Sequence, residues 1–430
     1  MGPPLKSLSL LGVLIAYAVY TLGPLVHRAV TTLGVLRRYP DGASVKGEII
    51  AIPDTVHCED LHYYAPSGTL FTACEDNADT RFKWFPGLAN FDDPELASKS
   101  RGSIHVIDPK TMQSHRLRFE NFEGPFITHG IDVIPDSAST DGQAVYIFAI
   151  NHVPETAPSG VKSPKARSQL ELFHHVVGSP TIQHVRSIWH PLIRTPNDIF
   201  AESPTSLYVS NDHRHPYAGL MRAIEDLYFG AKWTNIVHIQ LDSLAAADAA
   251  SDLAARVVLS GLHNANGLGH GRSEREILIS SCTSGVLHVG QLPDDLETGN
   301  ITIVESMEID SVADNPSYFA DPYALTPVDD RSGFLEAGLS RGIDLARTHR
   351  DPTAKDPVMV TYLRPSLGRW EKRILFEDDG TILRSISSAV LVPIDPVDEL
   401  NKGGVPGARK AWLFATGFLS KNMIALKVDL

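Results

Sequence analysis

Short clusters of Glu, Asp and Asn recur along this chain, each beside a run of residues with β-strand character. The clusters are Glu59-Asp60, Asn197-Asp198, Asn211-Asp212-His213, Asn264-Ala265-Asn266-Gly267 and Asp314-Asn315. Their side chains offer hard oxygen atoms, and Ca²⁺ binds about six to eight such oxygens. Taken singly, each cluster is also typical of a turn, because Asn and Asp side chains bond their own backbone there. A fold that gathers them at one place would make them a calcium site.

Two histidine fragments accompany these clusters, Thr128-His129-Gly130-Ile131 and Ile150-Asn151-His152. A neutral imidazole can take a proton from water near pH 7, so either histidine could be a general base. The chain holds 18 histidines, so one of them alone indicates little. It has no H-E-x-x-H zinc motif. The oxygen clusters and these histidines together favour a metal-assisted attack of water over covalent serine chemistry.

The elements that must position these residues are short β-type runs separated by Gly, Pro, Asp and Asn. The clearest runs are 69–74, 103–108, 144–150, 169–175, 206–210, 235–240, 276–281, 285–290, 358–363, 388–393, 412–416 and 422–428. With a weaker pair at 333–337 and 342–346, the paired runs recur roughly every 50 to 65 residues, as propeller blades do. About six blades fit the length, and loops of every blade converge on a propeller's axis. A large β-sandwich is the alternative.

One helix interrupts the β pattern between Tyr217 and Tyr228. Its apolar residues recur at helical spacing, and Arg222, Glu225 and Asp226 take the other face. This small helical insertion could be a lid over a site, a membrane-facing helix or a helix packed on the propeller's rim.

The N-terminal segment from Leu8 to Val26 has no charged residue and is long enough to span a bilayer. A cleaved signal peptide is the alternative to a retained anchor. The apolar stretch is long for a signal peptide and no small-x-small cleavage site follows it, which favours a transmembrane signal anchor. We assign 1–30 to this anchor and its flank, and 31–430 to a single β-propeller body.

Charge and cysteine content narrow the choice of partners and compartment. The net charge of -13 disfavours nucleic acid, whose phosphates attract basic surfaces. Three cysteines allow at most one disulfide. The triplet Asn300-Ile301-Thr302 is an N-glycosylation acceptor, which favours a lumenal or extracellular body.

The order and context of these fragments across nearly the whole body resemble the paraoxonase/arylesterase family of six-bladed β-propellers. The fragments that carry the resemblance are Cys58-Glu59-Asp60-Leu61, His129-Gly130-Ile131, Asn151-His152, Asn197-Asp198-Ile199, Asn211-Asp212-His213, Ala265-Asn266-Gly267 and Asp314-Asn315. The resemblance implies an all-β six-bladed propeller with two calcium ions in its central tunnel.

The family's ligands can be carried over residue by residue. The resemblance implies that the catalytic calcium is held by Glu59, Asn197, Asn266, Asp314 and Asn315. It implies that the structural calcium is held by Asp60, Asp198 and the carbonyl of Ile131. His129 would activate water, and His152 would hold its tautomer. The implied substrates are lactones and aryl esters, with organophosphate triesters as a side activity, and the implied location is a membrane or lipid surface in the secretory pathway.

Two departures from the family stand out. The closing strand 423–428 lacks the cysteine that usually joins the ends of the propeller, so the ring must close by strand pairing, and Cys58 with Cys74 is the pair left to consider. The stretch 316–338 lacks the family's active-site-wall histidine. Two alternatives remain: a non-catalytic calcium propeller that binds a lipid or protein partner, and a regucalcin-type lactonase with fewer metal ligands.

Overall fold

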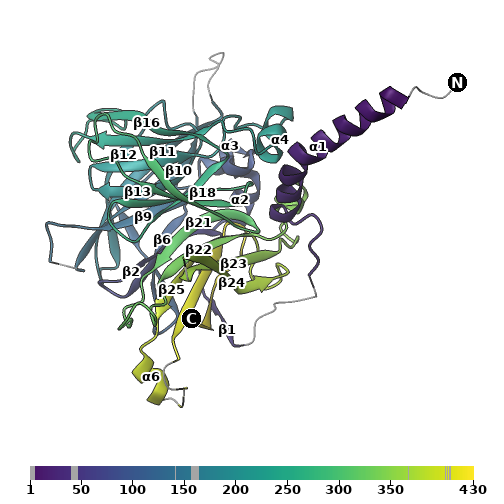
Figure 1. Cartoon of the computed structure of the whole chain (residues 1–430). Helices are drawn as coiled ribbons and strands as arrows, with labels where there is room; N and C mark the ends of the chain where they lie inside the picture. The colour runs from purple at the N-terminus through teal and green to yellow at the C-terminus, as the bar shows by residue number, and fades with distance from the viewer. Residues whose placement is uncertain are drawn as a thin grey trace.

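The structure is a computed structural model that describes residues 5–39, 47–140, 142–155, 164–366, 368–401, 403, 405 and 408–430. In the first helix it describes side chains only at 12, 13, 16, 17 and from 19 onward. The described chain is mostly β, and its sheets follow one another around an axis in a propeller-like arrangement (Figure 1).

Three sheets contain four consecutive antiparallel strands, and a fourth has an additional parallel strand at its outer edge. They are β2 (Cys58–Tyr64), β3 (Thr69–Cys74), β6 (Ser103–Asp108) and β7 (Gln113–Arg116); β9 (Thr128–Pro135), β10 (Ala144–Pro154), β11 (Ala166–Val176) and β12 (Thr181–Ile188), with β8 (Arg118–Glu120) outside; β13 (Pro196–Ser203), β14 (Ser206–Asn211), β15 (Thr234–Leu241) and β16 (Leu253–Leu262); and β17 (Ala265–His270), β18 (Glu276–Ser281), β19 (Val286–Gln291) and β20 (Thr302–Glu308).

The largest sheet has eight strands in the order β1-β27-β26-β25-β21-β22-β23-β24. Its halves are β21 (Val312–Phe319), β22 (Gly333–Leu339), β23 (Val358–Ser366) and β24 (Arg369–Asp378), and β25 (Ile386–Pro393), β26 (Lys410–Gly417), β27 (Met423–Asp429) and β1 (Ile49–Ile52). Among the described residues, the two halves are linked in the sheet by a single parallel residue pair, Asn315 in β21 with Ser388 in β25. A small hairpin is formed by β4 (Trp84–Phe85) and β5 (Asn90–Phe91).

The strands nearest the axis are β2, β9, β13 and β17, together with β21 and β25, which begin the two halves of the largest sheet. There β2 contacts β9 and β25, β13 contacts β9 and β17, and β21 contacts β17 and β25. The two ends of the body meet in one sheet, because β1 pairs antiparallel with β27, Ile49 opposite Leu426. The prediction of closure by strand pairing is therefore confirmed.

The hydrophobic core lies between neighbouring sheets. Strands such as β22 and β18 are buried along their whole length, whereas the outer strand β24 exposes most of its first half and the outer strand β20 exposes alternate residues. An antiparallel sheet whose last strand borders water has this alternation. Because their faces are polar, these outer strands lack the apolar runs on which the sequence prediction rested.

Helices are short apart from α1 (Leu5–Thr32). The others are α2 (Ala78–Lys83), η1 (Pro86–Leu88), α3 (Pro94–Ala97), α4 (Leu220–Leu227), η2 (Gly342–Asp344), α5 (Leu345–Thr348) and α6 (Pro396–Asn401). The predicted helix at 217–228 is present as the shorter α4, which begins after Gly219. The predicted strand at 342–346 is wrong: this segment is helical, and the Arg341 side chain bonds Asp344 one turn later.

The helix α1 covers the segment predicted to be an anchor. In the part of the chain that is described, no helix combines the length and apolar character needed to cross a membrane.

The disulfide Cys58–Cys74 joins β2 to β3. The two cysteines considered from the sequence therefore pair with each other, and Cys282 is a free thiol.

Candidate active site

The predicted oxygen ligands lie on the axis-side strands, at points where the ladder to the next strand is interrupted by a β-bulge. Register shifts occur around Glu59 in β2, around Asn197-Asp198 in β13, around Asn266-Gly267 in β17 and around Asp314-Asn315 in β21. A bulge re-aims a side chain that regular alternation would send elsewhere. These inner strands are thereby able to direct adjacent residues toward the axis.

Four ligand oxygens are buried without a hydrogen-bond partner among the described residues. They are Glu59 Oε2, Asn197 Oδ1, Asn266 Oδ1 and Asn315 Oδ1. The other carboxylate oxygen of Glu59 accepts a hydrogen bond from the Asn315 amide at 3.1 Å. Each unpaired buried oxygen costs about 1–3 kcal/mol. Four such unpaired oxygens, one from each of four inner strands, fit a hard cation that all four would coordinate.

Negative charge is concentrated at the same place. Burial raises the pKa of Glu59 well above its usual range, and the neighbouring Asp60 raises it further. Burial also raises the pKa of Asp314 well above its usual range, and Glu59 raises it further. Repulsion between buried carboxylates disfavours their charged forms. A divalent cation would instead favour the charged carboxylates. The carboxylates and the unpaired oxygens therefore fit the same bound cation.

The second predicted ligand set is also brought together. Asp60 Oδ2 accepts a hydrogen bond from the backbone N–H of Ile131 at 3.1 Å, and Asp198 Oδ2 accepts one from Leu268 at 2.7 Å. Burial and then Asp60 raise the pKa of Asp198. Each carboxylate oxygen has a second lone pair. A buried carboxylate whose pKa is raised by a second carboxylate beside it fits a cation between the two.

His62 lies at this second set and was missed in the sequence. Its Nε2 is 3.0 Å from Asp60 Oδ2, and its Nδ1 is 3.5 Å from Asp132 Oδ1. Burial disfavours the imidazolium, but Asp60 and Asp132 outweigh it and raise the pKa of His62 to about 9. His62 follows Asp60 by two residues in the same strand, and this spacing was the only signal for it.

Two glycines allow the inner strands to approach each other closely. A Cβ at Gly130 would lie 2.3 Å from Asp198 Oδ1, and a Cβ at Gly267 would lie 2.4 Å from the Asp314 carbonyl oxygen. Such distances are shorter than any real contact, so these positions exclude a side chain. Both glycines stand beside predicted site residues in the sequence.

The predicted histidine pair is formed. His129 Nδ1 lies 2.9 Å from His152 Nε2, and His152 Nδ1 lies 2.8 Å from the Ser168 hydroxyl. The other nitrogen of His129, Nε2, is 3.3 Å from the Asn197 amide and 3.9 Å from Glu59 Oε1. The pair is therefore adjacent to the ligand cluster.

Both histidines are neutral near pH 7 for the same reason. Burial lowers the pKa of His152 to about 3, and burial, followed by the effect of His152, lowers the pKa of His129 well below its usual range. The Phe85 ring packs edge-on against His129 with its centroid 4.7 Å away. The Trp84 indole donates to the His152 carbonyl at 2.8 Å. The hairpin β4–β5 thus contacts both histidines of the pair.

A cavity of about 500 Å³ opens over these groups. Its polar floor contains Glu59, His129, Asn197, Asn266 and Asp314. Its wall is mostly apolar and is formed by residues of α4, η1 and α5. The predicted helix at 217–228 therefore lies at the mouth of the cavity.

A charged network at this mouth was only partly visible in the sequence. His213 lies 2.9 Å from both Asp212 Oδ2 and Asp226 Oδ1, and Arg222 bonds Asp226 at 3.1 Å. Burial, the largest effect, and Arg222 lower the pKa of His213. Asp212 and Asp226 outweigh them, so the pKa of His213 is raised overall. Asp212 and His213 were noted as part of an oxygen cluster, whereas their partners on the helix were not.

The chain also contains a G-x-S-x-G spacing at 338–342, which is typical of nucleophilic serines. Ser340 is fully buried, and no histidine bonds its hydroxyl among the described residues. It therefore lacks the base that a serine nucleophile needs.

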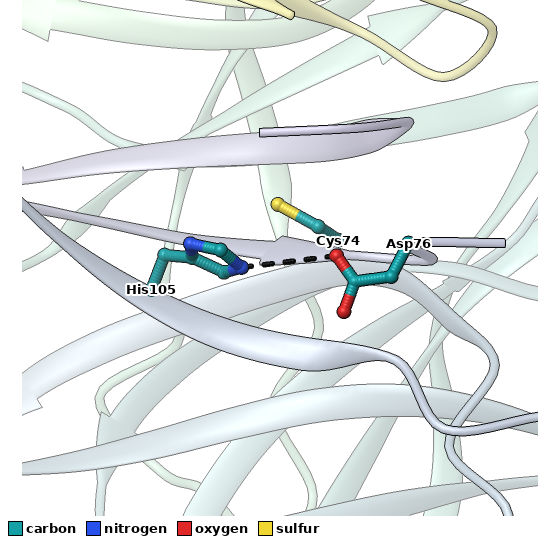
Figure 2. Close-up of side chains that lie close together, drawn as sticks. All are labelled: Cys74, Asp76 and His105. Carbon is teal, nitrogen blue, oxygen red and sulfur yellow. Dashed lines mark ion pairs between the residues drawn. The ribbon is translucent and has the colours of Figure 1, made fainter. Parts of the chain in front are cut away.

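Figure 2 shows a second group of potential metal ligands, formed by Cys74, Asp76 and His105. The Cys74 sulfur belongs to the disulfide, so it offers no thiolate. Asp76 accepts hydrogen bonds from Ser103 at 2.6 Å and from Arg116 at 2.7 Å, and Ser103 also bonds His105. Both ring nitrogens of His105 and one oxygen of Asp76 thus have protein partners, and among the described residues Asp76 Oδ1 is the only side-chain oxygen or nitrogen of this group that lacks a hydrogen bond.

These features define a propeller-like protein with a cluster of unpaired buried oxygens beside a neutral histidine pair. The sequence model of the arylesterase family matches residues 82–324, which is more than half of the chain. The chain belongs to the arylesterase family, and this membership makes it an esterase or lactonase type of hydrolase.

Relatives with curated names agree. The chain is 29% identical over 316 residues to chicken (Gallus gallus) serum paraoxonase/arylesterase 2, covering 71% of this chain and 75% of the relative. It is 23% identical to rabbit (Oryctolagus cuniculus) serum paraoxonase/lactonase 3, covering 71% and 74%. Against human (Homo sapiens) serum paraoxonase/arylesterase 2 it is 24% identical and spans 57% of the relative's length. Among solved structures, a calcium-binding regucalcin from Agrobacterium tumefaciens is 10% identical with a TM-score of 0.43, covering 89% of this chain and 94% of that one.

The close approach at Gly267 gives a first prediction. Gly267→Ala places a methyl group against Asp314 and Asn315, so we expect calcium affinity to fall at least tenfold and the melting temperature to fall. Calorimetric calcium titration and thermal unfolding measure both effects. Gly124→Ala is the control, because a Cβ there meets only the Phe122 ring at 3.8 Å. Equal calcium affinities for Gly267→Ala and Gly124→Ala would contradict the assignment of the ligand residues.

Proposed function

We propose that this protein is a calcium-dependent hydrolase of lactones and aryl esters, with organophosphate triesters as further substrates. We propose also that its sheets form six blades around the calcium site. The observation that carries the proposal is the set of four unpaired buried oxygens beside a neutral histidine pair, on the floor of one cavity. The names of the paraoxonase relatives support the substrate class.

The catalytic calcium would be held by Glu59, Asn197, Asn266, Asp314 and Asn315. The structural calcium would be held by Asp60, Asp198 and the carbonyl of Ile131. When bound, calcium supplies a Lewis acid that polarises a carbonyl or phosphoryl oxygen. The protein's part is to fix the oxygens in advance: Asn315 orients Glu59 through its amide, and the bulges keep the carbonyl sides of Asn197 and Asn266 unpaired.

The histidine pair would activate the attacking water. In the tautomer set that satisfies the chain of contacts, His129 donates from Nδ1 to His152 Nε2, and His152 donates from Nδ1 to Ser168. That places the lone pair of His129 on Nε2, which faces the ligand cluster and accepts from the Asn197 amide at 3.3 Å; water that displaces this amide contact would give its proton to Nε2. Burial keeps both rings neutral, so the lone pair is present at neutral pH.

The size and lining of the cavity suit a compact substrate with an apolar side group. A volume of about 500 Å³ lies within the range of small-molecule sites. The ester or lactone group would lie on the polar floor, and the apolar wall would exclude water around it. A non-catalytic calcium protein would not need an oriented base, and this favours the enzyme over the binding protein. The set of five catalytic ligands favours it over a regucalcin-type lactonase.

Calcium removal gives the second prediction. We expect chelation to abolish hydrolysis of phenyl acetate and of a panel of lactones, and Glu59→Gln to reduce kcat by at least a hundredfold, because the site loses a charged ligand. Asp108→Asn is the control, since Asp108 caps a turn far from the cavity. Turnover that survives complete calcium removal would exclude this mechanism, and calcium binding without any turnover would favour the non-catalytic alternative.

The histidine pair gives the third prediction. His129→Gln should reduce kcat for both lactones and phenyl acetate by roughly a hundredfold to a thousandfold, because water loses its base. His238→Gln is the matched control: His238 is equally buried but bonds Ser206 in another sheet. If His129→Gln retains near-parental turnover on both substrates, the base lies elsewhere.

We further propose that the body lies in the lumen of the secretory pathway or outside the cell, held at a membrane or lipid surface by its N-terminal segment. The disulfide is typical of an oxidising compartment. Asn300 is exposed, as a glycosylated residue must be. Apolar residues of α4 such as Leu220 and Leu227 are exposed beside the cavity mouth, where a lipid surface would cover them.

The location gives the fourth prediction. Expressed in a eukaryotic secretory system, the full chain should be recovered in the membrane fraction after alkaline washing, and a peptide N-glycosidase should increase its gel mobility. Asn300→Gln should remove that mobility change. Recovery in the cytosolic fraction with a reduced Cys58 would contradict the proposal.

A further inference from the structure

The C-terminal end of α1 and the residues after it pack onto the catalytic body. Figure 1 shows α1 projecting away from the sheets, with only this end against them. Thr32 is fully buried, and Leu33 is 7% exposed. The predicted boundary at residue 30 therefore falls inside a packed segment rather than in a linker.

Arg28 joins this end of the helix to two turns of the body. Its guanidinium donates to the Ser284 carbonyl at 3.1 Å and to the Ile309 carbonyl at 2.5 Å, and also bonds the Gly285 carbonyl. Its Nη1 lies 3.4 Å from Asp310 Oδ1. The turn before β19 and the turn before β21 are thus held by one side chain of α1.

The residues after the helix also form hydrogen bonds to the body. Arg37 donates to the Asp310 carbonyl at 2.8 Å, and Arg341 donates to the Gly34 carbonyl at 3.2 Å. Gly34 has a φ of +63°, and a Cβ there would lie 2.0 Å from the Ser340 carbonyl oxygen. The Ile343 N–H donates to the Leu33 carbonyl at 3.2 Å. The backbone on both sides of Leu33 is therefore fixed.

Leu33 lines the cavity described above. It joins Val312 and Leu339 in one buried hydrophobic cluster, and these two residues also line the cavity. Cys282 and Thr283 in the cavity wall directly precede Ser284, whose carbonyl Arg28 holds. The segment thus contributes one wall residue directly and fixes the turn that carries two others.

We infer that the α1 end, residues 28–37, completes the substrate cavity, and that Leu33 is a specificity-determining residue for the acyl or lactone side group. The inference rests on the proposed ester and lactone hydrolysis. The reacting carbonyl belongs on the polar floor, so the apolar wall to which Leu33 belongs is left for the hydrocarbon part of the substrate. A longer chain would reach this wall, and an acetyl group would not.

The test compares two esters with the same leaving group, 4-nitrophenyl acetate and 4-nitrophenyl decanoate, using the full chain. Leu33→Ala should reduce kcat/KM for the decanoate roughly tenfold through a higher KM, and should change the value for the acetate less than twofold. Leu33→Val, which removes one methylene group and keeps the packing better, should reduce the decanoate value roughly fourfold. Arg28→Ala should shift selectivity in the same direction, because the turns and Leu33 lose their support.

The matched control is Leu36→Ala, because Leu36 belongs to the same segment but is 80% exposed. It should leave the ratio of the two kcat/KM values unchanged. An equal ratio for Leu33→Ala, Leu33→Val and the parent, in folded protein, would overturn the inference.

A binding measurement separates this inference from the proposed function. Titration calorimetry with decanoate, the acid product, should show weaker binding to both Leu33 variants, whereas their calcium affinity should be unchanged. If the parent hydrolyses neither ester, the proposed function fails, and the decanoate titration still tests the wall. Equal decanoate affinity in parent and variants would overturn the inference on its own.

Discussion

The structure depends on one constraint: oxygen atoms from chain segments far apart in the sequence are buried at one place, with too few protein donors to satisfy them. Glu59 and Asn315 are separated by 256 positions, yet their side chains bond each other. Four of these oxygens have no described partner, and the buried carboxylates of Glu59 and Asp314 repel each other. Such an arrangement is costly by itself, so the sheets around it must be rigid enough to hold it.

The inner strands meet this constraint by local irregularity on a regular scaffold. Each ladder is interrupted by a bulge at the ligand position, and pairing continues on either side of it. Gly130 and Gly267 then let neighbouring inner strands approach at the same level. The neutral histidine pair is possible for a related reason, because the burial that makes unpaired oxygens costly also lowers the pKa of His129 and His152. The unpaired oxygens and the histidine pair thus share one buried environment.

The sequence predicted the middle strands of the sheets better than the outermost strands and better than the innermost strands β2, β9, β13, β17 and β21, which no predicted run covers. The runs 69–74, 103–108 and 276–281 coincide with β3, β6 and β18, because strands buried on both faces leave uninterrupted apolar runs. The polar strands β20 and β24 gave no such run. The family resemblance placed the ligand residues and the histidine pair, and the structure brings them together. The resemblance could not reveal the contact of His62 with Asp132 or that of Asp226 with His213, because both depend on packing between segments.

The pairing of β1 with β27 has a consequence for how the protein is made. During synthesis, β1 leaves the ribosome some 370 residues before its partner, as Ile49 opposite Leu426 implies. Until then the exposed edge of the last sheet and the edge of β1 are both open, and unpaired strand edges are prone to aggregate. Contacts of such long range also slow folding. The nascent chain must therefore be protected along its whole length, and entry into a compartment rich in chaperones would serve this need.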